Sequence, residues 1–186
     1  MSNFRISLSK TEAIILKRKE FEEADYFYYL YTKNWGKLIV RAHGVRKKES
    51  KLKSFLEPFV YGKFLLTNNQ GRKILANVEV VDYFPSIRSN LEKISTAGFF
   101  AWVIDNLVLE GEADEDLWNL IVKAYKFLDQ VEKFSENNVL KIQEVFLGRI
   151  LEVLGYGKQP SPQKFMSELI NRKVALFDIF KSSTID

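Results

Sequence analysis

The alternation of apolar and polar residues changes character near residue 84. Before that point, short apolar runs separated by turn residues are typical of β-strands, and after it apolar residues recur at helical spacing. We therefore expect two modules, residues 1–84 and residues 85–186. Five strands are predicted in the first module, at Thr11–Lys19, Asp25–Tyr31, Lys37–Ala42, Pro58–Thr67 and Arg72–Tyr83.

The segments between these strands predict how they connect. The loop from Thr32 to Gly36 and the loop from Asn68 to Gly71 are rich in residues that tolerate positive φ, so each predicts a hairpin. Between the third and fourth strands, Val45–Glu57 has apolar residues at helical spacing and predicts a short helical link. Three strands, a helical link and two more strands is the order of an oligonucleotide-binding (OB) barrel, so the expected class is α+β, with a five-stranded OB barrel followed by an all-α domain.

The second module is expected to be helical throughout. The first long helix is predicted at Asn90–Glu110, ending at Gly111, and the second begins at the acidic run Asp114–Asp116. A third is predicted at Glu136–Leu154, and Ser161 followed by a proline begins a fourth. The first helix carries these residues in helical register: Leu91, Ile94, Gly98, Trp102, Asp105 and Leu109. The fourth is expected to face inward with Phe165, Met166, Leu169, Ile170, Val174 and Phe177.

The amino-acid composition excludes several kinds of functional site. The chain has no cysteine and a single histidine, His43, which excludes disulfides, Cys-ligated zinc, iron–sulfur clusters and thiol catalysis. No serine is placed to complete a catalytic set with His43, so the expectation is a protein that is not an enzyme and has no cofactor. No signal peptide or apolar run of membrane-spanning length is visible, so we expect a cytoplasmic protein.

The modest net charge of +4 conceals an uneven distribution. Residues 1–80 carry 16 Lys and Arg against 8 Asp and Glu, and residues 81–186 carry 12 against 16. The densest stretch is Arg41–Lys53, with six basic side chains and one acid, where an OB barrel has its third strand and the exit loop. We predict phosphate contacts there rather than a merely solvated loop, and the expected DNA-binding residues are Lys37, Arg41, His43, Arg46, Lys47, Lys48, Lys51 and Lys53.

Strands two and three form the usual ligand platform of an OB barrel. In the third strand Lys37, Ile39 and Arg41 alternate with apolar residues, which predicts one packed face and one basic face. The second strand is aromatic on both faces, and the residues able to stack on bases are Tyr26, Tyr28, Tyr29 and Tyr31. Whether Tyr26 and Tyr28 or Tyr29 and Tyr31 share the face of Arg41 stays open, as does a purely structural role for each ring in the core or an interface.

Acidic residues gather between the first two predicted long helices. They could hold a magnesium ion, because hard cations take carboxylate ligands, but the start of a helix favours the same charges without a metal. We expect the second explanation and no metal site. The residues are Glu110, Glu112, Asp114, Glu115 and Asp116.

Several short motifs, in order, resemble the bacterial RecO recombination mediators. They are Glu23-Ala24-Asp25 before the aromatic strand, Thr32 with Gly36-Lys37, Ala42 to Lys47, Ser50-Lys51-Leu52, Leu56 to Phe59, and Leu154-Gly155-Tyr156. The family has an N-terminal OB fold followed by a helical domain. Many relatives carry a four-cysteine zinc module directly after the Leu-Gly-Tyr motif, whereas here the chain runs from Gly157 into the last helix, so the resemblance is to a form without zinc.

The resemblance implies a DNA repair and recombination mediator that binds single- and double-stranded DNA and anneals complementary strands. It also implies RecR and the C-terminal tail of the single-stranded-DNA-binding protein SSB as partners, with RecA loaded indirectly. Two other functions fit the same electrostatics: an RNA-binding OB protein of translation or RNA processing, and a protein-interaction scaffold whose lysines only keep it soluble.

Overall fold

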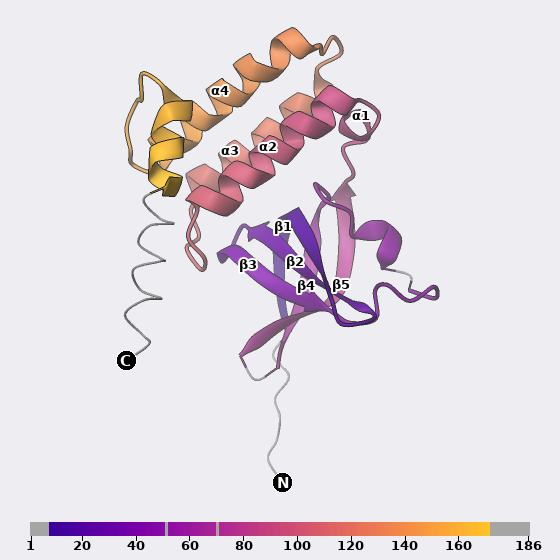
Figure 1. Cartoon of the computed structure of the whole chain (residues 1–186). Coiled ribbons are helices and arrows are strands. Elements are labelled where there is room, and N and C mark those ends of the chain that lie inside the picture. Colours follow the sequence, from indigo (N-terminus) through magenta and orange to yellow (C-terminus); the bar gives the residue numbers. More distant parts are fainter. Residues whose placement is uncertain (1–7, 51, 70, 172–186) are drawn as a thin grey trace, which may run out of the picture.

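The first half of the chain forms a closed five-stranded β-barrel, and helices form a layer over one side of it (Figure 1). This computed structural model describes residues 8–50, 52–69 and 71–171. The strands are β1 (Leu8–Phe21), β2 (Asp25–Thr32), β3 (Gly36–Ala42), β4 (Tyr61–Asn69) and β5 (Arg72–Asp82). All five predicted strands are present, and the predicted class, an OB-like barrel followed by a helical region, is confirmed.

The strand order around the barrel is β1-β2-β3-β5-β4, and β4 closes it against β1. Every neighbouring pair is antiparallel except β3 and β5, which run parallel and share the single register pair Arg41 and Ile74. The two strands therefore separate on either side of this pair. The ladder between β3 and β5 is thus the shortest in the barrel.

Turn geometry follows the residues that were expected to provide it. Gly36 and Gly71 have φ of 60° and 81°, so each of the two hairpins contains a residue in the left-handed region that glycine occupies without strain. The link between β3 and β4 is much less helical than expected, with only a 3-10 turn, η1 (Lys53–Phe55). Elsewhere in the described part of this link the backbone is irregular, and Val45 and Leu56 bury their side chains in the barrel.

The helical region begins at the expected residue with a short separate helix, α1 (Pro85–Arg88), which has proline in its first turn. It continues with α2 (Leu91–Leu107), α3 (Glu115–Gln130) and α4 (Glu136–Val153), and residues 162–171 are helical as well. The side chain of Asp114 accepts a hydrogen bond from the amide of Leu117 at 2.7 Å, so this residue caps α3. The acidic run thus starts a helix, as expected.

The expected end of α2 was wrong. The helix ends at Leu107 rather than near Gly111, because the amide of Gly111 donates to the carbonyl of Lys37 in β3 at 3.0 Å and the chain leaves the helix to reach it. The residues noted in helical register include exposed ones, since Leu91 is 76% and Trp102 is 49% exposed. The opposite side of α2 packs inward through Ala97, Phe100, Ala101, Val103, Ile104 and Leu107.

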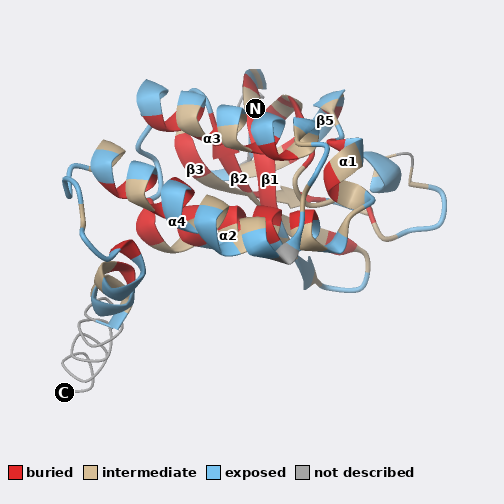
Figure 2. Ribbon diagram, turned by 90° about the horizontal axis from the view of Figure 1, so that it is seen from above, coloured by how far each residue is buried: buried red, intermediate tan, exposed pale blue. Residues whose placement is uncertain are grey.

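The core has two parts. One fills the barrel with inward residues of all five strands, and the other lies between the barrel and the helices. In the second part, Tyr31 of β2 stacks on Trp118 of α3 with ring centroids 6.3 Å apart, and Tyr125 of α3 is fully buried. Figure 2 shows this buried band beneath the exposed outer helix surfaces. Met166 of the last helix also joins it, whereas the predicted inward positions Val174 and Phe177 lie outside the described residues.

Candidate nucleic-acid interface

The outer face of β2 and β3 is where the structure brings basic and aromatic side chains together. Cross-strand register pairs Phe27 with Arg41, Tyr29 with Ile39 and Tyr31 with Lys37. Residues directly opposite each other in an antiparallel pair share a face of the sheet. The face of Lys37 and Arg41 therefore carries Phe27, Tyr29 and Tyr31, which answers the question that the sequence left open.

A groove with a cavity volume of about 690 Å³ crosses this face where β3 and β5 separate. Its floor and walls are partly apolar, and its basic side chains are Arg41 of β3, His43 just after that strand, and Arg72 and Lys73 at the start of β5. The other lining residues are Phe21, Phe27, Leu38, Ile39, Gly71, Ile74 and Glu110. Aromatic rings beside cations in an open groove on an OB platform are the elements with which single-stranded nucleic acid is bound.

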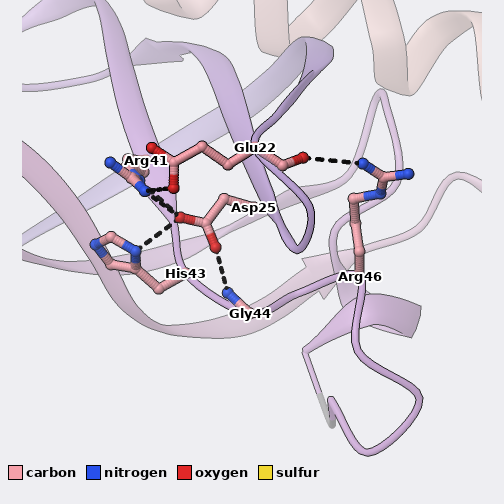
Figure 3. A network of polar contacts seen from close by, with 6 residues as sticks. All are labelled: Glu22, Asp25, Arg41, His43, Gly44 and Arg46. Atoms are coloured by element: carbon pink, nitrogen blue, oxygen red, sulfur yellow. Dashed lines mark hydrogen bonds and ion pairs between the residues drawn. The ribbon is translucent and has the colours of Figure 1, made fainter.

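One end of the groove is organised by the buried carboxylate of Asp25 (Figure 3). Asp25 accepts hydrogen bonds from Nε of Arg41 at 2.7 Å and from the amide of Gly44 at 2.8 Å, and its Oδ2 lies 2.8 Å from Nδ1 of His43. Arg41 also donates to Glu22 at 2.6 Å, and its guanidinium lies over the ring of Phe21 at 4.6 Å from the centroid. The network fixes two of the predicted DNA-binding side chains relative to the sheet.

The titration of this network reflects the same contacts. Burial alone would raise the pKa of Asp25, but hydrogen bonds from the Gly44 amide, Arg41 and His43 outweigh it and hold the pKa below its ordinary value. The hydrogen bond to Asp25, assisted by the charge of Glu22, raises the pKa of Arg41. Asp25 is therefore ionised at neutral pH, and Arg41 is held at the groove between two carboxylates.

The basic loop after β3 extends the cationic surface beyond the groove. Its backbone is anchored by Val45, and the amide of Arg46 donates to the carbonyl of Ala24 at 2.9 Å. Arg46 lies 3.1 Å from Glu20 and over the ring of Tyr26, whereas Lys47, Lys48 and Lys53 are exposed. Lys51 lies outside the described residues. The exposed lysines lie on the loop that follows His43, outside the groove itself.

Lys37 occupies a different position from the other predicted cations. It is 9% exposed, and its ammonium group donates to the backbone carbonyl of Asp105 in α2 at 2.6 Å. The carboxylate of Asp105 also pairs with Lys17 of β1. The alternation along β3 was interpreted correctly, but the helical layer covers this end of the basic face, so Lys37 joins barrel to helix in the described structure.

None of the four tyrosines proposed for base stacking lines the groove. Tyr28 and Tyr31 are fully buried, the first inside the barrel and the second beneath α3, so neither offers a ring face to a base. Burial raises the pKa of Tyr28 to about 12. Tyr29 packs against the helical core under Lys17, and Tyr26 lies between the guanidinium groups of Arg18 and Arg46.

Four residues that line the groove were not predicted from the sequence: the aromatic residues Phe21 and Phe27 and the β5 cations Arg72 and Lys73. Phe27 could not be distinguished in the sequence from the tyrosines on either side of it. Arg72 and Lys73 follow the hairpin glycine Gly71, so the sequence predicted that they begin a strand. It did not predict that the start of this strand lies beside β3.

Two further properties concern the described residues alone. Within residues 8–50, 52–69 and 71–171, no three His, Cys, Asp or Glu side chains are arranged to hold a metal ion. In the same part of the chain no helix combines the length and apolar character needed to cross a membrane.

Fold and groove together define a class of protein: an OB-like barrel with an open basic groove, joined through a shared core to a helical region. The family model described as "Recombination protein O N terminal" matches residues 6–84, the whole barrel. The chain is 29% identical to the DNA repair protein RecO of Pelotomaculum thermopropionicum over 151 residues, which is 81% of this chain and 57% of that protein. It is 27% identical to the RecO of Clostridium novyi over 152 residues, 82% of this chain and 58% of that protein.

A third relative, the RecO of Bacillus velezensis, is 32% identical over 122 residues, covering 66% of this chain and 48% of the relative. Residues 6–84 thus match the N-terminal domain of the RecO family, and the similarity to proteins named DNA repair protein RecO extends over about four fifths of the chain. The chain spans a little over half the length of the first of these relatives.

Proposed function

We propose that the chain is a DNA repair and recombination mediator that binds single- and double-stranded DNA with its barrel and promotes annealing of complementary strands. The observation that carries the proposal is the groove between β3 and β5, where Phe21 and Phe27 lie beside Arg41 and Arg72. The exposed lysines of the following loop extend this surface. Phosphates would bind the cations, and bases would meet the aromatic rings.

Annealing requires no covalent chemistry. A cationic surface that binds two strands lowers the repulsion between their phosphates, and an open groove leaves the base edges free to pair. The same surface supports the role that the family name suggests. Together with RecR, the protein would act at DNA covered by SSB and help RecA to load.

Protein partners need a surface that the DNA does not occupy. The outer face of α2 is such a surface, because Leu91, Ile94 and Trp102 are exposed there and none of them lines the groove. Contiguous exposed apolar side chains often mark sites of protein interaction. We propose this helical layer as the region that receives RecR or the SSB tail.

The test compares charge reversals at two places. Replacing Lys47 and Lys48 with Glu should reduce affinity for a fluorescent single-stranded oligonucleotide by at least about tenfold at low salt and should weaken the salt dependence. The matched control reverses Lys123 and Lys133, two exposed lysines of the helical region. Equal affinity in the two double variants would contradict the proposed surface.

Competition between DNA and RNA oligonucleotides of the same sequence addresses the RNA-binding alternative, which a strong preference for RNA would favour. A scaffold would instead lose all nucleic-acid binding at physiological salt while retaining a protein partner. Annealing of complementary strands, measured by fluorescence transfer between labelled oligonucleotides, tests the activity itself.

A further inference from the structure

Glu110 has an unexpected position for an acidic residue. It is the only acid among the described residues that line the groove, and it faces a lining that otherwise carries Arg41, His43, Arg72 and Lys73. It comes from the loop between α2 and α3 and is exposed. A carboxylate in a groove that attracts phosphates repels them locally, so its presence affects where a strand can run.

The loop that carries Glu110 is fixed to the barrel. Glu110 forms a parallel β-bridge with Lys37, and the next residue, Gly111, donates its amide to the Lys37 carbonyl at 3.0 Å. A little further on, the carbonyl of Glu112 lies so close to Gly36 that a Cβ atom there would collide with it. Figure 1 shows this loop descending from α2 to the start of β3. The backbone contacts hold Glu110 at the groove.

Two segments contact β3 at different points along the strand, and different residues of the groove lie at each point. Glu110 is bridged to Lys37, whereas β5 meets the same strand at Arg41, four residues later. At a rise of about 3.3 Å per residue these points lie about 13 Å apart. Arg41 and His43 occupy the end that leads to the basic loop, and Glu110 occupies the end that leads to the helical layer. Arg72 and Lys73 precede Ile74 in the parallel strand β5, so they lie on the same side of the Arg41–Ile74 pair as Glu110.

We propose that Glu110 is an end stop for the nucleic acid. Its charge keeps the sugar–phosphate backbone from continuing along β3 toward the helices, so that the strand leaves the groove over His43 and the basic loop. The effect is local, because salt screens exposed charges over about 10 Å. The inference rests on the proposed function and adds to it a residue that determines the path of the strand.

The test uses three isosteric changes that each remove one negative charge. Glu110→Gln should bind oligodeoxythymidine about threefold more tightly than the wild-type protein at low salt, with the gain disappearing at high salt. Glu112→Gln, in the same loop but outside the groove lining, and Glu144→Gln, exposed on α4, should leave the affinity unchanged. No gain for Glu110→Gln, or an equal gain for all three, would overturn the proposal.

A second variant tests the path. In Glu110→Lys the repulsive end becomes attractive, so the shortest oligonucleotide that reaches full affinity should be longer than for the wild-type protein. An unchanged length would overturn the end stop. Failure of the two proposals is distinguishable: if the wild-type chain binds no oligonucleotide the proposed function fails, and if it binds but Glu110→Gln has no effect only the end stop fails.

Discussion

Oδ2 of Asp25 lies 2.7 Å from Nη2 of Arg41, which links the start of β2 to the end of β3 at the mouth of the groove. Because Glu22 contacts the same guanidinium, Arg41 is already neutralised on two sides. Its role is thus as much to orient the groove as to attract phosphate. Among the described cations of the groove and the following loop, those that form no ion pair are available to a polyanion, namely Arg72, Lys73, Lys47, Lys48 and Lys53.

Replacing Asp25 with Asn should destabilise the barrel. The amide keeps the shape of the side chain but removes the charge that Arg41 and His43 contact, so we expect the free energy of unfolding to fall by about 1–3 kcal/mol. Urea denaturation followed by tryptophan fluorescence measures the change. The control is Glu23→Gln in the same turn, an exposed position where a change of less than about 0.5 kcal/mol is expected. Equal stability of the two variants would contradict the role of Asp25.

The same carboxylate should produce a pH dependence of known sign. Its pKa is lowered in the folded protein, so its contribution to stability is complete above its ordinary value of about 3.9 and is lost as the pH falls through the folded value. The difference in unfolding free energy between wild type and Asp25→Asn should therefore be constant near neutrality and shrink below about pH 4. A difference that stays constant from pH 7 to pH 3 would show that ionised Asp25 is not the stabilising form.

Gly36 should tolerate no side chain. Its φ of 60° is strained for alanine, and a Cβ atom would in addition collide with the Glu112 carbonyl, so we expect Gly36→Ala to cost about 2 kcal/mol or more. Gly71→Ala is the matched control, because Gly71 also has positive φ, at 81°, but open space around its Cβ position. Only the backbone strain, about 1 kcal/mol, should remain there. Thermal unfolding of both variants separates the two effects, and equal losses would contradict close packing of the loop on β3.

The local sequence pattern was sufficient to predict the strands and their turns, but it was not sufficient to predict which residues line the groove. The alternation in β3 correctly separated Arg41 from Val40, and the hairpin glycines marked both turns, because these features depend on residues close in sequence. Lys37 has the same alternation as Arg41 yet is covered by α2, which is 54 residues or more away along the chain. The periodicity within β3 therefore cannot predict that α2 covers Lys37.

The groove residues missed from the sequence share one physical reason. Phe27 lies in a run of six residues in which five are aromatic, so its exposure depends on which face the helices cover. Arg72 reaches the groove because β5 runs parallel to β3 and meets it at one register pair. Glu110 reaches it only because the loop after α2 bridges to Lys37. Each of these positions depends on packing between segments that are far apart in the sequence.

Phe27 provides the last prediction, which separates stacking from charge. If its ring stacks on a base, Phe27→Leu should weaken single-stranded DNA binding by about fivefold, near the lower limit of about 1 kcal/mol per base, because the ring already packs on Phe21 at 4.5 Å between centroids. Phe127→Leu, at an exposed phenylalanine of α3, is the matched control and should have no effect. Since no phosphate contact is lost, the logarithm of the affinity of Phe27→Leu should change with salt at the wild-type slope, unlike that of the variant with Lys47 and Lys48 reversed. A reduced slope would show that the ring acts by positioning the neighbouring Arg41 rather than by contacting a base.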